Sequence, residues 1–398
     1  MTEACLARVE AREGTVRAFA ALDDAGWRRD AAAASADSVL AGLPVGVKDV
    51  LDAAGLPAGY GSPIWDGWTP RADSAGVAMM RAAGGVVAGK TVTTEFATRR
   101  AGPTTNPHDP SRTPGGSSQG SAAGVAAGFF SLAYGTQTAG SIIRPAAFCG
   151  VVGFKPTYGT VHRGGMRVMS ESLDTIGTMA RDVFGCALLA GASAGVDLWS
   201  GLGARVAAPR VLFVPGPAED LLEESTRSLL ENAASALSRA GARVTRARLP
   251  DAVMAAVPVH PVVMHGETRQ ALAWERAAAP DLLSHWLVER AAWIESLPAG
   301  ALDEARAVFA GARASFAEVM RDADIVMTAS APGEAPVGLE STGDPACNLL
   351  WTALHAPCVT VPAGRGPNGM PLGVQVVGAI GRDRETLAAA EWVLAALS

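Results

Sequence analysis

The sequence predicts an α/β fold, because stretches with helical periodicity alternate along the chain with short apolar stretches typical of buried strands. Three pairs of elements support this prediction. They are a helix over 73–83 with a strand over 86–88, a strand over 210–214 with a helix over 218–240, and a helix over 302–321 with a strand over 324–327. The end of the chain adds two strands, over 358–361 and 373–377, and a closing helix that Asp383 could cap.

Each predicted helix has its own justification. The first contains Val77, Met79 and Met80 and ends at a glycine pair, and the second is amphipathic and stops at Gly241. The third has apolar residues at helical spacing. These residues are Ala305, Val308, Phe309, Ala312, Phe316, Val319 and Met320.

Length and composition favour a single globular domain over 1–398. Hydrophobic residues make up 49% of the 398 residues, which is ample for a large core. No internal repeat or long Pro/Ser linker divides the chain, although an Ala/Arg-rich region extends from about 190 to 320. The net charge of −6 argues against a nucleic-acid binder that relies on a broad basic face.

The cysteines and the N-terminus indicate a cytoplasmic protein. The five cysteines form no CxxC pair and no metal-ligand spacing with the six histidines, so we expect neither disulfides nor a metal site. The N-terminus lacks the basic and apolar segments of a signal peptide. The uncharged stretch 113–143 contains 12 Gly or Ser among 31 residues, which is too poor in large apolar side chains for a membrane span.

Lysine is rare in this chain. Only Lys48, Lys90 and Lys155 occur among 33 basic residues, and a buried lysine can lose its proton whereas an arginine cannot. The sequence therefore directs attention to these three positions as candidate sites of proton transfer.

Two short patterns suggest functions that their context does not favour. Gly84 to Thr91 fits the phosphate-binding P-loop, but a strand occupies its interior and a helix precedes it, whereas a P-loop follows a strand and opens a helix. Gly116 to Gly120 fits a nucleophile elbow with Ser118 as nucleophile, but a turn sequence precedes it where an apolar strand is required. His260, His265, His285 or His355 would then have to serve as the base.

A third pattern is longer and more specific. Thr113-Pro-Gly-Gly-Ser-Ser-Gln-Gly-Ser, Gly135-Thr-Gln-Thr-Ala-Gly-Ser-Ile-Ile-Arg-Pro and Gly153-Phe-Lys-Pro-Thr together resemble the signature block of the amidase signature family of serine hydrolases. The likeness continues in Gly42-Leu-Pro-Val-Gly-Val-Lys-Asp, Ser172-Leu-Asp-Thr-Ile-Gly and Leu372-Gly-Val-Gln-Val-Val-Gly. It covers about 40–180 and 325–398 and implies a central twisted mixed sheet with helices on both faces, with 190–320 shaping the substrate site.

The resemblance implies a Ser-cisSer-Lys triad and no cofactor. By position, the nucleophile falls on Ser141, the bridging serine after a cis peptide bond on Ser117 and the base on Lys48. Lys48 must be neutral to accept a proton, so burial among apolar residues should lower its pKa, and neighbouring Asp49 should point away.

The turn before the nucleophile should provide the oxyanion hole. Backbone N–H groups of Thr138, Ala139, Gly140 and Ser141 are the candidate donors. Ala139 replaces a glycine that is usual in the family, which narrows the site but keeps the N–H.

Arg144 departs from the usual family pattern, because it lies three residues after the nucleophile and not two. Some short members of the malonamidase type have this variant at the substrate end of the site. Its guanidinium could bind a carboxylate of a small amide such as malonamate. The alternative is that Arg144 pairs with an internal carboxylate such as Asp174.

The sequence thus predicts an amidohydrolase that cleaves the C–N bond of a small-molecule amide through a seryl acyl-enzyme, without metal, nucleic acid or membrane. One alternative is the glutaminase-like A subunit of a tRNA-dependent amidotransferase, a role for which the chain is rather short. Another is a non-catalytic binding protein, which the retention of all three triad residues disfavours. The sequence leaves open whether the protein forms a homodimer.

Overall fold

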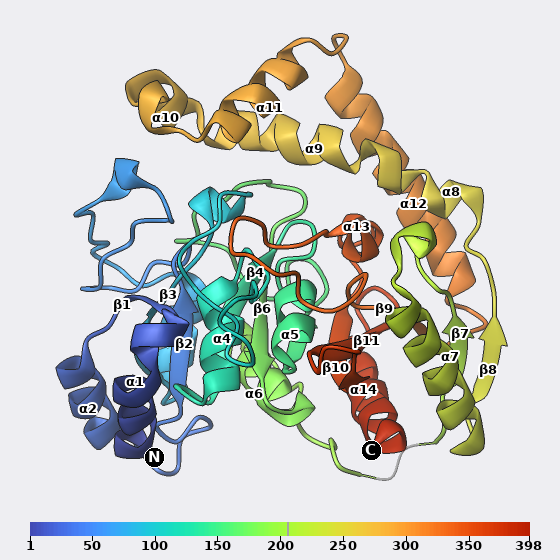
Figure 1. Ribbon diagram of the computed structural model, residues 1–398, viewed down its shortest axis with the longest axis horizontal. Helices are drawn as coiled ribbons and strands as arrows, with labels where there is room; N and C mark the ends of the chain where they lie inside the picture. The colour runs from blue at the N-terminus through green and yellow to red at the C-terminus, as the bar shows by residue number, and fades with distance from the viewer. Residues whose placement is uncertain (205–206) are drawn as a thin grey trace.

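The computed structural model describes residues 1–204 and 207–398 and confirms the predicted α/β fold. Its centre is one eleven-stranded sheet, in the order β1-β3-β2-β4-β6-β5-β10-β11-β9-β7-β8 (Figure 1). The strands are β1 (Phe19–Ala21), β2 (Pro44–Lys48), β3 (Val86–Thr91), β4 (Leu132–Gln137), β5 (Val152–Lys155), β6 (Thr175–Ala180), β7 (Arg210–Phe213), β8 (Arg243–Arg246), β9 (Ile325–Ala329), β10 (Cys358–Arg365) and β11 (Pro371–Val377). The sheet is mixed, because β3, β2 and β4 run parallel, as do β9, β7 and β8, whereas the strands between these two groups pair antiparallel.

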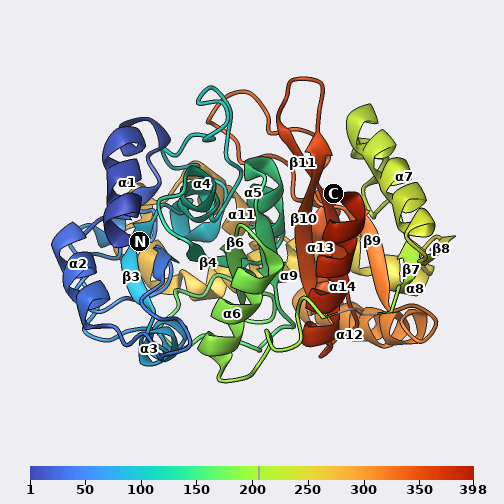
Figure 2. The ribbon, with the colours of Figure 1, turned by 90° about the horizontal axis from the view of Figure 1, so that it is seen from below.

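Helices cover both faces of this sheet (Figure 2). They are α1 (Thr2–Val16), α2 (Asp24–Ala33), α3 (Ala75–Ala82), α4 (Gln119–Ala127), α5 (Ile143–Cys149), α6 (Val183–Ala194), α7 (Glu224–Arg239), α8 (Asp251–Met254), α9 (Ala256–Ala271), α10 (Ala273–Ala278), α11 (His285–Glu295), α12 (Ala301–Val319), α13 (Ala346–Ala353) and α14 (Asp383–Leu397).

Strand alternation explains why the core has two layers. Val87 packs into one hydrophobic cluster with residues of α3, α6, α7 and α14, whereas its neighbours Val86 and Ala88 pack into another with α1 and α4. Val376 and Val377 divide in the same way between the first cluster and a third one that includes α12 and α13. Successive side chains of a strand point to opposite faces, so buried strands need apolar residues at consecutive positions.

Most predicted elements are present, with two corrections. The helix predicted over 218–240 begins at Glu224, because Leu222 is buried in an extended conformation after a short 3₁₀ turn, Glu219–Leu221. Asp383 does not cap the last helix. It is the first residue of α14, and its carboxylate accepts a hydrogen bond from the backbone N–H of Thr157 at 2.7 Å.

The helices α9 to α12 form an arm that lies across the top of the sheet in Figure 1. The arm belongs to the Ala/Arg-rich region 190–320, which also contributes β7 and β8 to the sheet. Within the arm, α9 packs against both α11 and α12. The three helices therefore form one continuous inner surface of the arm. The division into one domain with a substrate-shaping middle region stays a prediction.

Candidate active site

The predicted site residues converge at one edge of the sheet. Lys48 is the last residue of β2, and Ser141 lies in the turn between β4 and α5. Strands β2 and β4 are parallel neighbours, paired through Gly46 and Ala133. The carboxyl ends of parallel strands meet at the same edge, which is where α/β proteins bind ligands.

The amine of Lys48 is fully buried and has three oxygen neighbours. Its Nζ lies 2.7 Å from Ser117 Oγ, 2.7 Å from Thr136 Oγ1 and 3.4 Å from the Thr136 carbonyl oxygen. A neutral amine has two N–H groups and one lone pair. If Thr136 accepts both N–H groups, the lone pair faces the hydroxyl of Ser117.

Burial lowers the pKa of Lys48 well below its ordinary value. The charge of Asp174 opposes this shift, and that of Arg144 adds to it. The low-dielectric surroundings disfavour the ammonium form, so the environment supplies the neutral amine that a general base requires.

The other two lysines have different surroundings. Lys90 lies inside β3 and forms a buried ion pair with Asp49, with Nζ and Oδ1 2.6 Å apart. Asp49 therefore points away from Lys48, as the sequence predicted. Lys155 donates to the carbonyl oxygen of Pro156 at 2.9 Å.

Ser117 lies in the segment before α4, and the peptide bond between Gly116 and Ser117 is cis. Its side chain is buried, and its described hydrogen bond is the one to Lys48. The hydrogen bonds described for this chain include none between Ser117 and Ser141. The structure thus joins two members of the predicted triad directly and places the third in the neighbouring turn.

Hydrogen bonds to side chains hold the turn around Ser141 in place. Gln137 Oε1 accepts from the N–H groups of Ile142 and Ile143 at 2.9 and 3.1 Å. The carbonyl oxygens of the turn are also engaged, because His260 Nε2 lies 3.0 Å from that of Thr138 and Thr352 Oγ1 donates to that of Ala139 at 2.7 Å.

The N–H groups of the same turn remain available. Among the hydrogen bonds of the described residues, none uses the N–H of Thr138, Ala139, Gly140 or Ser141 as donor. A side chain at Gly140 would be crowded, since a Cβ there would lie 3.0 Å from Asn348 Nδ2 and 3.1 Å from Arg144 Nη1. Free donors on a small-residue turn fit the geometry of an oxyanion hole.

Arg144 is buried and contacts neither Asp174 nor any other carboxylate of the described residues. Its Nε donates to the carbonyl oxygen of Thr342 at 2.8 Å, and Nη2 donates to the carbonyl oxygen of Gly116 at 2.8 Å and to Thr342 Oγ1 at 3.2 Å. Nη1 has no partner. Burial lowers the pKa of Arg144 to about 10, so it remains charged at neutral pH.

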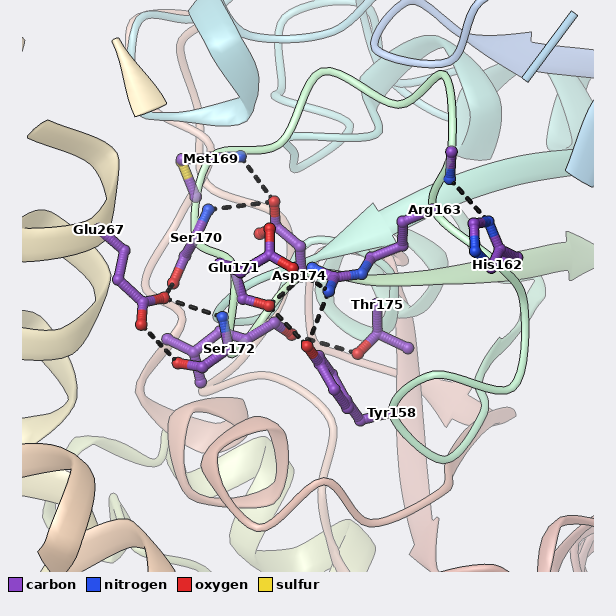
Figure 3. A network of polar contacts seen from close by, with 12 residues as sticks. Tyr158, His162, Arg163, Met169, Ser170, Glu171, Ser172, Asp174, Thr175 and Glu267 are labelled. Atoms are coloured by element: carbon purple, nitrogen blue, oxygen red, sulfur yellow. Dashed lines mark hydrogen bonds and ion pairs between the residues drawn. The ribbon is translucent and has the colours of Figure 1, made fainter. Parts of the chain in front are cut away.

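Asp174 instead supports the turn of the site. It accepts hydrogen bonds from the N–H groups of Met169 and Ser170 at 2.7 and 3.1 Å (Figure 3). It also accepts one from the hydroxyl of Thr138. The prediction that Arg144 pairs with this carboxylate is therefore wrong, because backbone and hydroxyl donors already surround it.

Glu267 of α9 ties the arm to the same loop. Its carboxylate accepts from Ser170 Oγ at 2.6 Å and from the N–H and Oγ of Ser172 at 2.9 and 2.8 Å (Figure 3). Arg306 of α12 binds the same carboxylate at 2.7 Å. The loop 169–174 is thus fixed between the arm and the turn before Ser141.

A cavity of about 290 Å³ opens beside Ser141. Thr138, Ala139 and Arg144 line it from the sheet side, and six residues of the arm line it from above. These are His260, Pro261, Met264 and His265 from α9 and Trp286 and Arg290 from α11. Sequence reasoning assigned substrate shaping to this region but singled out none of these residues for that role, because they form no motif.

The structure does not favour Ser118 as a nucleophile paired with histidine. Ser118 Oγ is buried and contacts the backbone N–H and carbonyl oxygen of Thr136 at 3.3 and 3.4 Å. His260 faces Thr138, and burial lowers its pKa to about 4, which keeps it neutral.

Within residues 1–204 and 207–398, no group of three or more His, Cys, Asp or Glu side chains is arranged to hold a metal ion. In the same ranges, no helix has the length and apolar character needed to cross a membrane.

A mixed sheet with a polar site at its strand ends is typical of α/β enzymes, and comparisons with known proteins give the family. The Amidase family model matches residues 1–387. The chain belongs to the amidase family and is an enzyme that hydrolyses amide C–N bonds.

Individual relatives agree with this membership. The A subunit of the glutamyl-tRNA(Gln) amidotransferase of Desulforudis audaxviator (strain MP104C) is 34% identical over 94% of this chain and 87% of its own length. The corresponding protein of Roseiflexus castenholzii (strain DSM 13941 / HLO8) is 39% identical over 69% of this chain, and the match spans 61% of that protein. A crystal structure of an amidase superimposes with a TM-score of 0.89 at 29% identity, over 99% of this chain and 94% of that one. The predicted amidase signature fold is confirmed.

Proposed function

We propose that the protein hydrolyses a small amide through a seryl acyl-enzyme. Lys48, acting through Ser117, takes the proton of Ser141, whose oxygen attacks the amide carbonyl carbon. Backbone N–H groups of Thr138, Ala139 and Gly140 stabilise the oxyanion. The amine leaves with the transferred proton, and water then releases the acid by the same relay. The buried, hydrogen-bonded pair of Lys48 and Ser117 is the observation that supports this proposal.

Replacing the nucleophile tests the mechanism. Ser141→Ala should lower kcat by roughly 10⁴-fold or more, because the covalent step has no substitute. Ammonia release from a panel of small amides measures this, and a thermal unfolding curve checks that the variant is folded. Turnover near that of the unchanged protein would eliminate Ser141 as nucleophile.

The substrate we propose carries a carboxylate, as malonamate does. Arg144 supports this, because its Nη1 has no partner within residues 1–204 and 207–398 and lies near Gly140, beside the nucleophile. An unpaired guanidinium nitrogen can bind a carboxylate by a charge-assisted hydrogen bond. Malonamate should therefore be hydrolysed about tenfold or more faster than neutral malonamide, and Arg144→Ala should remove the difference. Equal rates in the unchanged protein and in the variant would exclude this role.

The second candidate function is that of a glutaminase subunit in a tRNA-dependent amidotransferase. It is favoured by the identity of 34% with such a subunit over most of the chain. Assays of the purified chain separate the two functions. Hydrolysis of small amides without partners favours the amidohydrolase, whereas activity on glutamine only, and only with added partner subunits, favours the amidotransferase.

We also propose that the enzyme is cytoplasmic and acts on its small-molecule amide without nucleic acid. The five free cysteines are buried, which is compatible with a reducing compartment. Light scattering of the purified chain would determine whether it forms a homodimer.

A further inference from the structure

The cavity beside Ser141 is lined by cationic side chains. Three arginines, Arg99, Arg144 and Arg290, contribute to its wall, and no Asp or Glu of the described chain does. Among the described residues, none of the three forms an ion pair. Asp344 lies outside this wall, and its charge favours the charged form of Arg144 without an ion pair between the two described residues. Guanidinium groups keep their protons in proteins, so the remaining positive charge is left for solvent or a bound anion to balance.

The arginines belong to two separate parts of the cavity. Arg144 lies next to the nucleophile, and its pKa is lowered mainly by burial and further by the charge of Arg99, while the charge of Asp344 raises it. Arg290 comes from α11 of the arm, where its charge contributes to lowering the pKa of His265 after the larger effect of burial. His265 is therefore neutral near pH 7 and adds no positive charge to that of Arg290.

Arg290 has donor capacity that the protein leaves unused. Its Nε is buried and makes no hydrogen bond within the described residues. A buried guanidinium N–H without a partner costs free energy, which an acceptor from a ligand would recover. The arm has other arginines for comparison, because Arg269 and Arg276 both pair with Glu295 at 2.8 Å, away from this cavity.

We infer that the cavity accepts amides with two acid groups, one bound by Arg144 beside Ser141 and the second bound by Arg290 on the arm. This inference rests on the proposed amidohydrolase function and extends it from one carboxylate to two. A cavity of about 290 Å³ has room for a small substrate of this kind. Arg290 then selects substrates and takes no part in the chemical step.

A series of three amides tests the inference. Malonamide carries no acid group, malonamate carries one and N-(carboxymethyl)malonamate carries two. The unchanged protein should hydrolyse the last with a kcat/KM about tenfold or more above that of malonamate, since a charge-assisted hydrogen bond contributes that much. Arg290→Met should abolish this advantage with little change for malonamate, and Arg290→Lys, which keeps the charge, should retain part of it. Arg269→Met is the matched control and should behave like the unchanged protein.

Binding measurements separate this inference from the proposed mechanism. Calorimetric Kd values for the three amides, measured with Ser141→Ala, need no turnover and should show the same preference and the same dependence on Arg290. If Ser141→Ala stays active, the seryl mechanism fails, while the preference for two acid groups can still be measured. Equal Kd values for the one-acid and two-acid amides, or equal losses for all three amides in Arg290→Met, would overturn the inference.

Discussion

The edge of the sheet and the helical arm contribute to one cavity but are built in different ways. At the sheet edge, neighbouring strands position Lys48, Thr136 and the turn before Ser141. Hydrogen bonds accepted by Gln137 and Asp174 hold this turn as well. The arm presents side chains from α9 and α11 and is tied to the loop beneath it by a few carboxylates.

Two carboxylates make most of this connection. Glu267 binds Ser170 and Ser172, and Glu275 of α10 accepts from Trp65 Nε1 at 2.9 Å and pairs with Arg167. Side chains that transfer protons must be held at fixed distances from one another, whereas side chains that select substrates can be substituted without loss of the chemical step. Substitutions at the sheet edge should therefore affect every substrate alike, and substitutions in the arm should affect some substrates and the stability of the arm.

The largest effect is expected for Lys48→Arg. Arginine keeps the positive charge but cannot deprotonate, so kcat/KM should fall by about 10³-fold or more for every amide, nearly as far as in Lys48→Ala. Lys90→Arg is the matched control, because it makes the same change in the neighbouring strand and preserves the ion pair with Asp49. Steady-state kinetics on several amides measure both. Activity of Lys48→Arg within tenfold of the unchanged protein would exclude Lys48 as the base.

A smaller effect is expected for Thr136→Val, which removes the hydroxyl that accepts from Lys48. The lone pair of the amine is then less well aimed at Ser117, and kcat/KM should fall by about 10- to 100-fold. Activity requires neutral Lys48, so it declines as the pH drops through the pKa of this group. Loss of an acceptor disfavours the ammonium form further and lowers the pKa of Lys48. The acidic limb of the pH–activity profile should therefore move to lower pH.

Thr136→Ser keeps the hydroxyl and should restore both the rate and the position of the limb. A Val variant with lower activity but an unchanged pH profile would mean that Thr136 serves the fold and not the amine.

The contrast between the two regions explains how much the sequence could predict. Lys48, Ser117 and Ser141 lie in long motifs at strand ends, where consecutive residues determine the local backbone. The residues of the arm that line the cavity, such as Trp286 and Arg290, lie on helices without a motif. Their role depends on how α9 and α11 pack, and Glu267 reaches a partner 97 residues away in the chain. Such long-range pairings leave no local pattern to read.

Loss of the hydrogen bonds that Glu267 makes between the arm and the loop 169–174 should mainly lower the stability of the fold. Burial raises the pKa of Glu267, but hydrogen bonds from Ser170, Ser172 and Arg306 outweigh burial and lower it. A carboxylate with a lowered pKa stabilises the fold above its unfolded pKa of about 4.3, and this contribution is lost as the pH falls through the folded value. Glu267→Gln should therefore lower the free energy of unfolding by about 1 to 3 kcal/mol at pH 7 and by less below about pH 4.

Denaturant unfolding at both pH values measures this difference. Glu295→Gln is the control on the same arm, since its half-exposed pairs with Arg269 and Arg276 are screened by solvent and should contribute little to stability. Equal losses for the two variants would mean that the bonds of Glu267 do not hold the arm to the loop.

The smallest expected effect is a gain in stability, not a loss, and it concerns a substitution at the sheet edge. The folded state lowers the pKa of Lys48, so it binds fewer protons than the unfolded chain, and the buried amine destabilises the fold at neutral pH. The hydrogen bonds to Ser117 and Thr136 offset only part of this cost. Lys48→Met should therefore be inactive yet more stable than the unchanged protein at pH 7.

The gain should shrink as the pH rises towards about 10.4, the ordinary pKa of lysine, because the unfolded chain then also loses this proton and the difference between the two states disappears. Lys90→Met provides the contrast, since it leaves Asp49 buried without its partner and should destabilise the fold. Denaturant unfolding of both variants at about pH 7 and pH 10 would measure the two effects. A Lys48→Met protein less stable than the unchanged one at pH 7 would mean that Lys48 stabilises the fold. A more stable one would mean that the sheet edge keeps a buried amine at a cost to the fold, as expected for a group retained for its chemistry.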